Sequence, residues 1–262
     1  MRHDEGQETH SGADARPSRL PGPWLAVIFV IVAFLVATVV GQVLLSIYPA
    51  AKHWDAAQTQ EWLANSLWAQ FSYICLAYGM LFGLIVLFLK RRGLGLASIG
   101  FKRPRLRDAG WALALLPLYY GSYIVIVEVA ALLIPSLDVN QKQQIGFEGI
   151  HGFVPLLITF ISLAVIPPIV EETVMRGFLF TSLRSRLSLL WATLITSVLF
   201  ALGHLQFGSG APLLWVAALD TFTLSLFLIY LRQKTDSLAA SMLLHALKNT
   251  VAFLTIFIFH LS

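Results

Sequence analysis

Seven apolar runs constrain the fold of this chain more than any other feature of its sequence. They cover residues 23–48, 67–89, 109–134, 152–185, 188–206, 212–231 and 237–260. The last three are each about the ~20 residues that an α-helix needs to cross a bilayer, and the first four are longer. Backbone groups in lipid must be satisfied within the segment, so spans of this kind are helical. The sequence therefore predicts an all-α, polytopic transmembrane helix bundle of about seven spans.

The composition supports a membrane protein and argues against a nucleic-acid partner. Hydrophobic residues make up 57% of the 262 residues and charged residues only 12%. A mean hydropathy of +0.75 is too high for a soluble domain of this size. The net charge of +4 comes from Lys and Arg that cluster between the apolar runs, as topology signals do. The expected surroundings are therefore the lipid bilayer.

The start of the chain predicts a tail followed by a retained helix. Residues 1–22 are polar and charged among Gly, Ser and Pro, a composition typical of a disordered cytoplasmic tail. The run from Pro23 to Tyr48 is longer than a signal-peptide core and lacks a clear small-residue cleavage site. We therefore expect N-terminal transmembrane helices with a basic cytoplasmic loop over 23–108. The remaining helices, over 109–262, are expected to form a separate core.

The distribution of basic residues predicts the orientation. An N-inside, C-outside arrangement places fourteen Lys and Arg side chains inside, many of them in the loop 90–107. Only Lys52 and Lys142 then lie outside, while Arg176 and Lys248 fall within spans. This asymmetry follows the positive-inside rule. The compact size and the basic loops favour a multi-pass protein of a bacterial cell (inner) membrane.

Three charged residues lie within six positions of the fourth run. A charge at the bilayer centre costs ~2.5–3.5 kcal/mol, so Glu171, Glu172 and Arg176 need partners. On a helix Glu172 and Arg176 are i,i+4 and can pair, whereas Glu171 lies about 100° around the axis. The preceding Pro167 and Pro168 predict a kink or a new helix start. The pattern predicts one structural carboxylate and one available for chemistry.

Two later runs each carry a polar pair with i,i+4 spacing, Phe200 with His204 and His245 with Asn249. Glu171 and His204 are equally far from the turn between the fourth and fifth runs, so they are expected at similar depth. His245 lies closer to its own turn, a mismatch of about 9 Å at 1.5 Å per residue. Helix tilt must absorb that mismatch if the three runs are to form one site.

A cluster of these side chains predicts amide hydrolysis by one of two routes. A carboxylate can take a proton from water, a histidine can orient the water or protonate the leaving amine, and an asparagine can donate to an oxyanion. Alternatively, Glu171, His204 and His245 could hold Zn²⁺, which also generates a hydrolytic water. The residue types leave both routes open.

The three motifs, in this order, resemble those of the CPBP intramembrane proteases. They are Glu-Glu-x-x-x-Arg at 171–176, Phe-x-x-x-His at 200–204 and His-x-x-x-Asn at 245–249, and the resemblance covers about 110–260. That family includes the type II CAAX prenyl endopeptidases and bacteriocin-processing or self-immunity proteins. The resemblance implies that residues 109–262 form a membrane-embedded protease core.

The resemblance also implies roles for the motif residues. Glu171 would activate water, His204 would assist, and His245 with Asn249 would stabilise the oxyanion. The implied catalytic set is Glu171, Glu172, Arg176, His204, His245 and Asn249. The absence of an HExxH pair favours a glutamate-dependent mechanism over a metalloprotease, with zinc as the alternative. The expected substrate is a membrane-associated peptide or protein, with CAAX-type C-terminal processing implied only by the family.

Less specific interpretations compete with the enzyme. Glu172 with Arg176 would also make a structural ion pair, and Phe200 is expected to be a packing residue. Asp220 and Lys248 lie outside the motifs, and an ion pair between them would explain both. The alternative function is a non-catalytic membrane immunity or assembly factor, or a transporter, that uses the same intramembrane polar residues.

Overall fold

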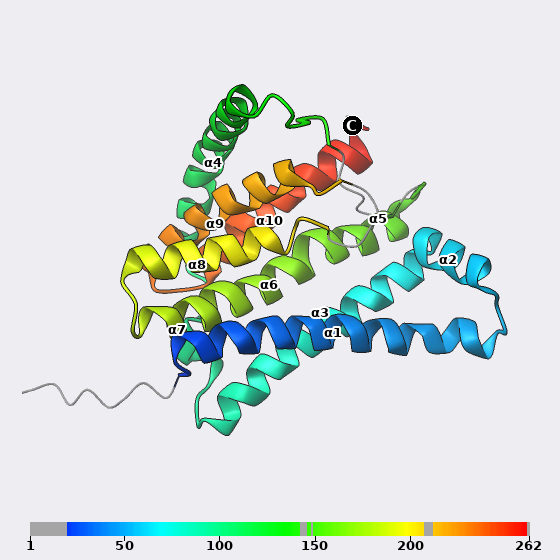
Figure 1. Ribbon diagram of the computed structural model, residues 1–262, viewed down its shortest axis with the longest axis horizontal. Helices are drawn as coiled ribbons and strands as arrows, with labels where there is room; N and C mark the ends of the chain where they lie inside the picture. Colours follow the sequence, from blue (N-terminus) through cyan, green and yellow to red (C-terminus); the bar gives the residue numbers. More distant parts are fainter. Residues whose placement is uncertain (1–19, 142–145, 148, 207–211, 261–262) are drawn as a thin grey trace, which may run out of the picture.

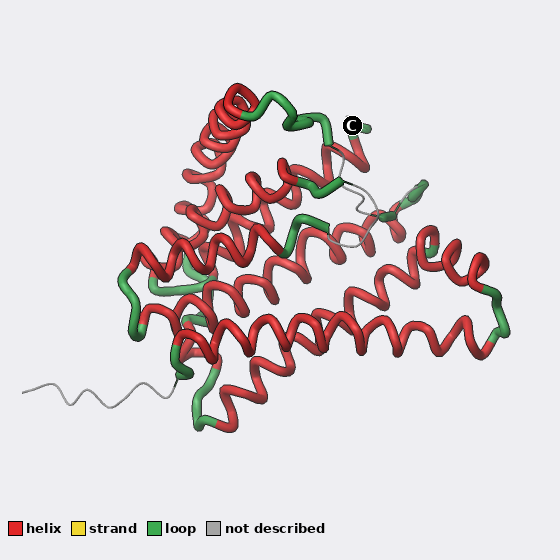
Figure 2. Tube along the Cα trace, in the orientation of Figure 1, coloured by secondary structure: helices red, strands yellow, loops and turns green. Residues whose placement is uncertain are grey.

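The computed structural model describes residues 20–141, 146–147, 149–206 and 212–260. These residues form helices and loops without strands, as Figure 2 shows, which confirms the predicted all-α class. The predicted tail lies almost wholly outside the described residues. The helices are α1 (Pro23–Ala51), α2 (Ala56–Asn65), α3 (Leu67–Arg91), η1 (Leu96–Ile99), α4 (Leu106–Leu133), α5 (Phe153–Phe160), η2 (Ile161–Val165), α6 (Ile166–Glu172), η3 (Thr173–Leu179), α7 (Phe180–Arg184), α8 (Leu189–Leu202), α9 (Trp215–Thr235), α10 (Ala239–Phe253) and η4 (Leu254–Ile258).

Six helices in the described part of the chain are long and apolar enough to cross a membrane. They are α1, α3, α4, the continuous helix Phe153–Arg184, α9 and the continuous helix Ala239–Ile258. The predicted run 188–206 is represented by α8, whose 14 residues span about 21 Å and so fall short of a ~30 Å hydrocarbon core. Six of the seven predicted runs therefore correspond to long apolar helices, and the seventh corresponds to a short apolar helix.

The helix α2 lies between the predicted apolar runs 23–48 and 67–89, where the sequence analysis expects no helix. It forms because Asp55 and Gln58 make a reciprocal capping box, in which the backbone N–H of Gln58 donates to the Asp55 carboxylate at 2.8 Å. The ring of Trp62 on this helix contacts that of Tyr48 in a tilted arrangement, with centroids 5.1 Å apart. Local capping rather than an apolar stripe thus specifies this helix.

The N-terminal helices pack directly on the helix that carries the paired glutamates. Small residues on α1 allow close approach to α3: a Cβ at Gly41 would lie 3.4 Å from the Cβ of Ala77. Phe29 of α1 and Phe88 of α3 both contact the buried ring of Phe178, at centroid distances of 5.3 and 5.2 Å. One apolar cluster therefore includes residues from both sides of the expected division at residue 108.

The basic loops gather at one end of the bundle, to the left in Figure 1. The backbone N–H of Leu238 donates to the carbonyl of Gly100 at 2.8 Å, and Lys102 pairs with Asp236 at 2.5 Å. The hydrogen bond from Lys102, followed by that from Arg232, lowers the pKa of the Asp236 carboxyl group. The loops after α3 and α9 therefore lie at the same end, and α8 must carry the chain away from it before α9 returns.

We predict that a reporter fused to the C-terminus lies outside when the protein is produced in a bacterium. Because α8 and α9 form an antiparallel pair between the two ends of the bundle, we expect the short helix α8 to add a seventh crossing to the six long helices. A C-terminal alkaline phosphatase fusion should be active and a fusion after Lys102 inactive, with green fluorescent protein giving the opposite pattern. An inactive C-terminal fusion would contradict the N-inside, C-outside topology.

Candidate active site

The helix with the paired glutamates changes its winding on both sides of them. The π-helical segments η2 and η3 flank α6, and Pro167 with Pro168 lies in the first turn of α6. The expected disturbance before Glu171 takes the form of a change of winding, while the helix continues from Phe153 to Arg184 without a new start. Pro167 has no N–H for the carbonyl of Leu163, and the side-chain amide of Asn249 donates to that oxygen at 2.9 Å. Asn249 thus replaces a missing backbone donor and ties α10 to this helix.

The second glutamate forms the predicted buried ion pair. Arg176 Nη1 lies 2.9 Å from Glu172 Oε1, and both side chains are 0% exposed. The guanidinium carbon also lies 4.2 Å from the ring centroid of Phe200, a cation–π contact. The next residue, Gly177, packs so closely that a Cβ added to it would lie 3.0 Å from the side chain of Ile99. Close packing therefore surrounds the carboxylate of Glu172, and Arg176 is its ion-pair partner.

His245 lies between the two glutamates. Its Nδ1 is 3.1 Å from Glu172 Oε1 and its Nε2 is 3.8 Å from Glu171 Oε2. A carboxylate can only accept, so His245 donates its Nδ1–H to Glu172, and in that tautomer the Nε2 atom faces Glu171. The depth mismatch expected from the sequence does not keep these residues apart.

Glu171 points in a different direction from Glu172. Its Oε1 accepts a hydrogen bond of 2.7 Å from the hydroxyl of Tyr78 on α3, and its side chain is 16% exposed. The sequence analysis did not identify Tyr78, because a tyrosine in an apolar run is indistinguishable from packing or interface bulk. Only the packing of α3 against α6 reveals it as a partner of the carboxylate.

A cavity of about 760 Å³ opens beside Glu171. It extends from the interior of the bundle to residues 146–147 and 149–151 and to His260, at the end opposite the basic loops. Its walls are largely apolar, including Leu224 and Phe253. The polar side chains that line it are Glu171, Asp220, Thr221, Lys248, Asn249, His151, His204, His245 and His260.

His204 reaches this cavity from the turn that follows α8. Its Nδ1 lies 2.8 Å from the carbonyl of Phe200, which accepts an Nδ1–H and leaves Nε2 as the acceptor of the neutral ring. The ring of Phe200 lies 4.9 Å from that of His204 and 5.9 Å from that of His245. Phe200 is buried and thus fills the space between the two histidines, as expected of a packing residue.

The described side chains do not assemble the donor set expected for zinc. Among them, no three His, Cys, Asp or Glu side chains lie close enough together to hold a metal ion. Glu171 and His245 approach each other, but His204 does not complete a three-ligand group with them. The donor set for Zn²⁺ therefore does not fit the site as these side chains lie.

The other intramembrane charges divide into a pair and an isolated carboxylate. Lys248 Nζ lies 2.9 Å from Asp220 Oδ2, which confirms the predicted ion pair. The hydroxyl of Tyr119 donates to the other oxygen of Asp220. Glu128 is exposed on α4 and does not line the cavity. Asp220 and Lys248 therefore belong to the same cavity as Glu171.

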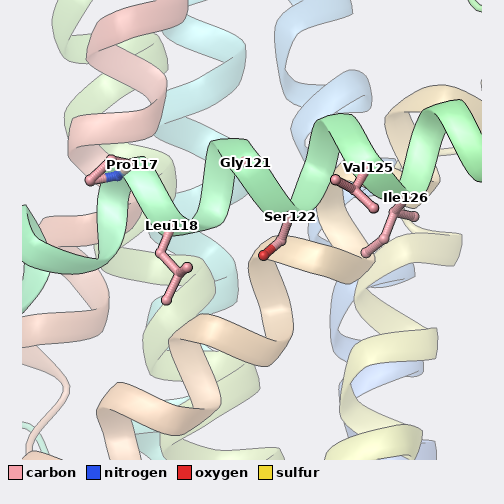
Figure 3. Close-up of a pocket in the computed structure, with 6 residues that line it drawn as sticks. All are labelled: Pro117, Leu118, Gly121, Ser122, Val125 and Ile126. Atoms are coloured by element: carbon pink, nitrogen blue, oxygen red, sulfur yellow. The ribbon is translucent and has the colours of Figure 1, made fainter.

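A second concavity lies on the surface of α4 and carries no such chemistry. Figure 3 shows its lining side chains along this one helix. They are Pro117, Leu118, Gly121, Ser122, Val125 and Ile126. This lining contains no titratable side chain, so this concavity offers nothing that could activate water.

Fold and site together define a multi-pass helical membrane protein with carboxylate, imidazole and amide side chains gathered around a cavity inside its bundle. Residues 153–251 match the family model described as type II CAAX prenyl endopeptidase Rce1-like. This match contains all three motifs and confirms the resemblance to the CPBP proteases. No match was found among curated proteins or among solved structures.

We predict that Arg176→Met lowers the free energy of unfolding by about 3–5 kcal/mol, because Glu172 would keep a buried charge without its partner. Denaturant or thermal unfolding in detergent, followed by helical circular dichroism, measures the change. The matched control is Arg186→Met, which alters an exposed side chain at the turn before α8. Equal stability of the two variants would contradict the role of the buried pair.

Proposed function

We propose that this chain is an intramembrane endopeptidase that hydrolyses a peptide bond in a membrane-associated protein or peptide, with CAAX-type C-terminal processing as its reaction. The observation that carries the proposal is the contrast between the two glutamates. Glu172 is fully buried and neutralised by Arg176, whereas Glu171 faces a large apolar cavity. The match of residues 153–251 supports the class of reaction.

In this mechanism Glu171 takes a proton from the attacking water. Oε2 of Glu171 and Nε2 of His245 are 3.8 Å apart, a separation that allows both atoms to hydrogen-bond the same substrate water. The hydrogen bond from Tyr78 to Oε1 holds the carboxylate so that Oε2 faces this position. The ion pair of Glu172 and Arg176 holds His245 through its Nδ1.

The remaining motif residues act on the tetrahedral intermediate. Asn249 uses one amide N–H for the carbonyl of Leu163, and its second N–H is available to an oxyanion in the cavity. As the peptide C–N bond breaks, the proton that Glu171 took from the water passes by way of His204 Nε2 to the leaving amine. The apolar walls exclude bulk water, which strengthens each of these interactions.

The substrate and the location follow from the walls of the cavity and from the helices. A largely apolar cavity inside a helix bundle selects apolar segments that reside at the membrane. The helices make the protein a multi-pass membrane protein, and the basic loops favour the bacterial inner membrane. The rival function, an immunity or assembly factor or a transporter, would use the same polar residues without turnover.

The decisive experiment compares wild-type protein with Glu171→Gln on a library of membrane peptides in detergent. Loss of the general base should lower kcat by about 10²–10⁴-fold while the helical content stays unchanged. The matched control is Glu128→Gln, which removes an exposed carboxylate outside the cavity and should retain activity. Metal content determined on the same preparation tests the zinc alternative.

Full activity of Glu171→Gln, or no turnover by the wild-type protein across a broad library, would favour the non-catalytic rival.

We also predict that Tyr78→Phe lowers kcat about tenfold or more, the effect of losing one hydrogen bond to a charged group. KM should stay close to the wild-type value, because Tyr78 does not line the cavity. Tyr73→Phe, five residues earlier on α3, is the control for removing a hydroxyl from this helix. A rise in KM without a change in kcat would contradict a positioning role.

A further inference from the structure

The ion pair of Asp220 and Lys248 lies outside the three motifs, yet both residues line the proposed active-site cavity. Their side chains are partly accessible there, with exposed fractions of 17% and 22%. A purely structural pair in lipid is best shielded on all sides, because exposure of a charge to an apolar ligand is costly. The position of the pair therefore indicates contact with the polar part of a ligand.

The pair is arranged so that Asp220 holds the lysine and leaves its ammonium group with further donors. Asp220 binds the hydroxyl of Tyr119 through Oδ1 and Lys248 through Oδ2, so both of its oxygens have partners. An ammonium group has three N–H donors, and Asp220 accepts one of them. Lys248 can thus donate to a second acceptor in the cavity without leaving Asp220.

Lys248 is the one lysine or arginine of the described lining, so it is the cationic side chain that an acidic ligand group would meet there. The two carboxylates of the described lining already have partners, since Asp220 pairs with Lys248 and Glu171 accepts a hydrogen bond from Tyr78. The other polar side chains of the lining carry ammonium, hydroxyl, amide or imidazole groups. These are Thr221, Lys248, Asn249, His151, His204, His245 and His260.

We infer that Lys248 binds the free C-terminal carboxylate of the substrate, an inference that rests on the proposed protease function. Lys248 is i+3 from His245 on α10, so the two side chains share a face about one turn apart. A carboxylate at Lys248 places the peptide bond beside His245 and Glu171 only a few residues from the end of the chain, since an extended residue spans about 3.3 Å. The site thus cuts near free C-termini and rejects internal segments.

The test is the binding of two apolar peptides that differ only at the C-terminus, one with a free carboxylate and one with an amide. They carry a fluorophore at the N-terminus and are titrated against purified Glu171→Gln protein in detergent, so that no turnover interferes. The acid should bind about tenfold or more tightly than the amide, the effect of one hydrogen bond between charged groups.

Variants at Lys248 then test whether this side chain causes the preference for the acid over the amide peptide. Lys248→Gln in the same background should reduce the affinity for the acid to that for the amide and leave the amide unchanged, whereas Lys248→Arg and Asp220→Asn should keep the preference. The matched control is Lys234→Gln, which alters a lysine that lies over the ring of Trp111, away from the cavity. It should also leave the preference intact.

Equal binding of the two peptides, absence of binding by both, or an equal loss for both in Lys248→Gln would overturn the carboxylate site. Cleavage by the wild-type protein separates this result from a failure of the proposed function. Turnover of acid and amide at equal rates would leave the protease standing without the carboxylate site. A preference in binding without turnover of either peptide would leave the carboxylate site standing without the protease.

Discussion

The buried ion pair of Glu172 and Arg176 is the interaction on which the site depends. Two charges inside a membrane bundle are tolerated only as a pair, and this pair is completed by the imidazole of His245 and the ring of Phe200. Each of these contacts joins a different helix to the helix with the glutamates. The same interaction that compensates the buried charges therefore also orients the histidine that faces Glu171.

A missing backbone donor has a similar double effect. Pro167 leaves the carbonyl of Leu163 without its usual partner, and Asn249 supplies one from α10. The winding changes on both sides of α6 turn Glu171 towards the cavity and keep Glu172 in the core. Irregular winding within helices is common at functional sites, and here it separates two adjacent carboxylates into different environments.

Helices outside the matched segment complete the site. Residues 153–251 contain the three motifs, but α3 provides Tyr78 for Glu171 and α4 provides Tyr119 for Asp220. The N-terminal helices are therefore more than a membrane anchor for the core at 109–262, because one of them contacts the proposed general base. Their packing through small residues and aromatic rings brings that contact about.

The sequence by itself determined the helical membrane class, because apolar runs in lipid have only helices available, and it determined the pair of Glu172 and Arg176, because i,i+4 spacing is local. The disturbance before Glu171 followed from proline in the same way. Only the tertiary structure decided the partner of Glu171 and the cavity that Lys248 shares with it. Those contacts join helices far apart in the chain, and their geometry depends on tilt and side-chain packing, which no local pattern encodes.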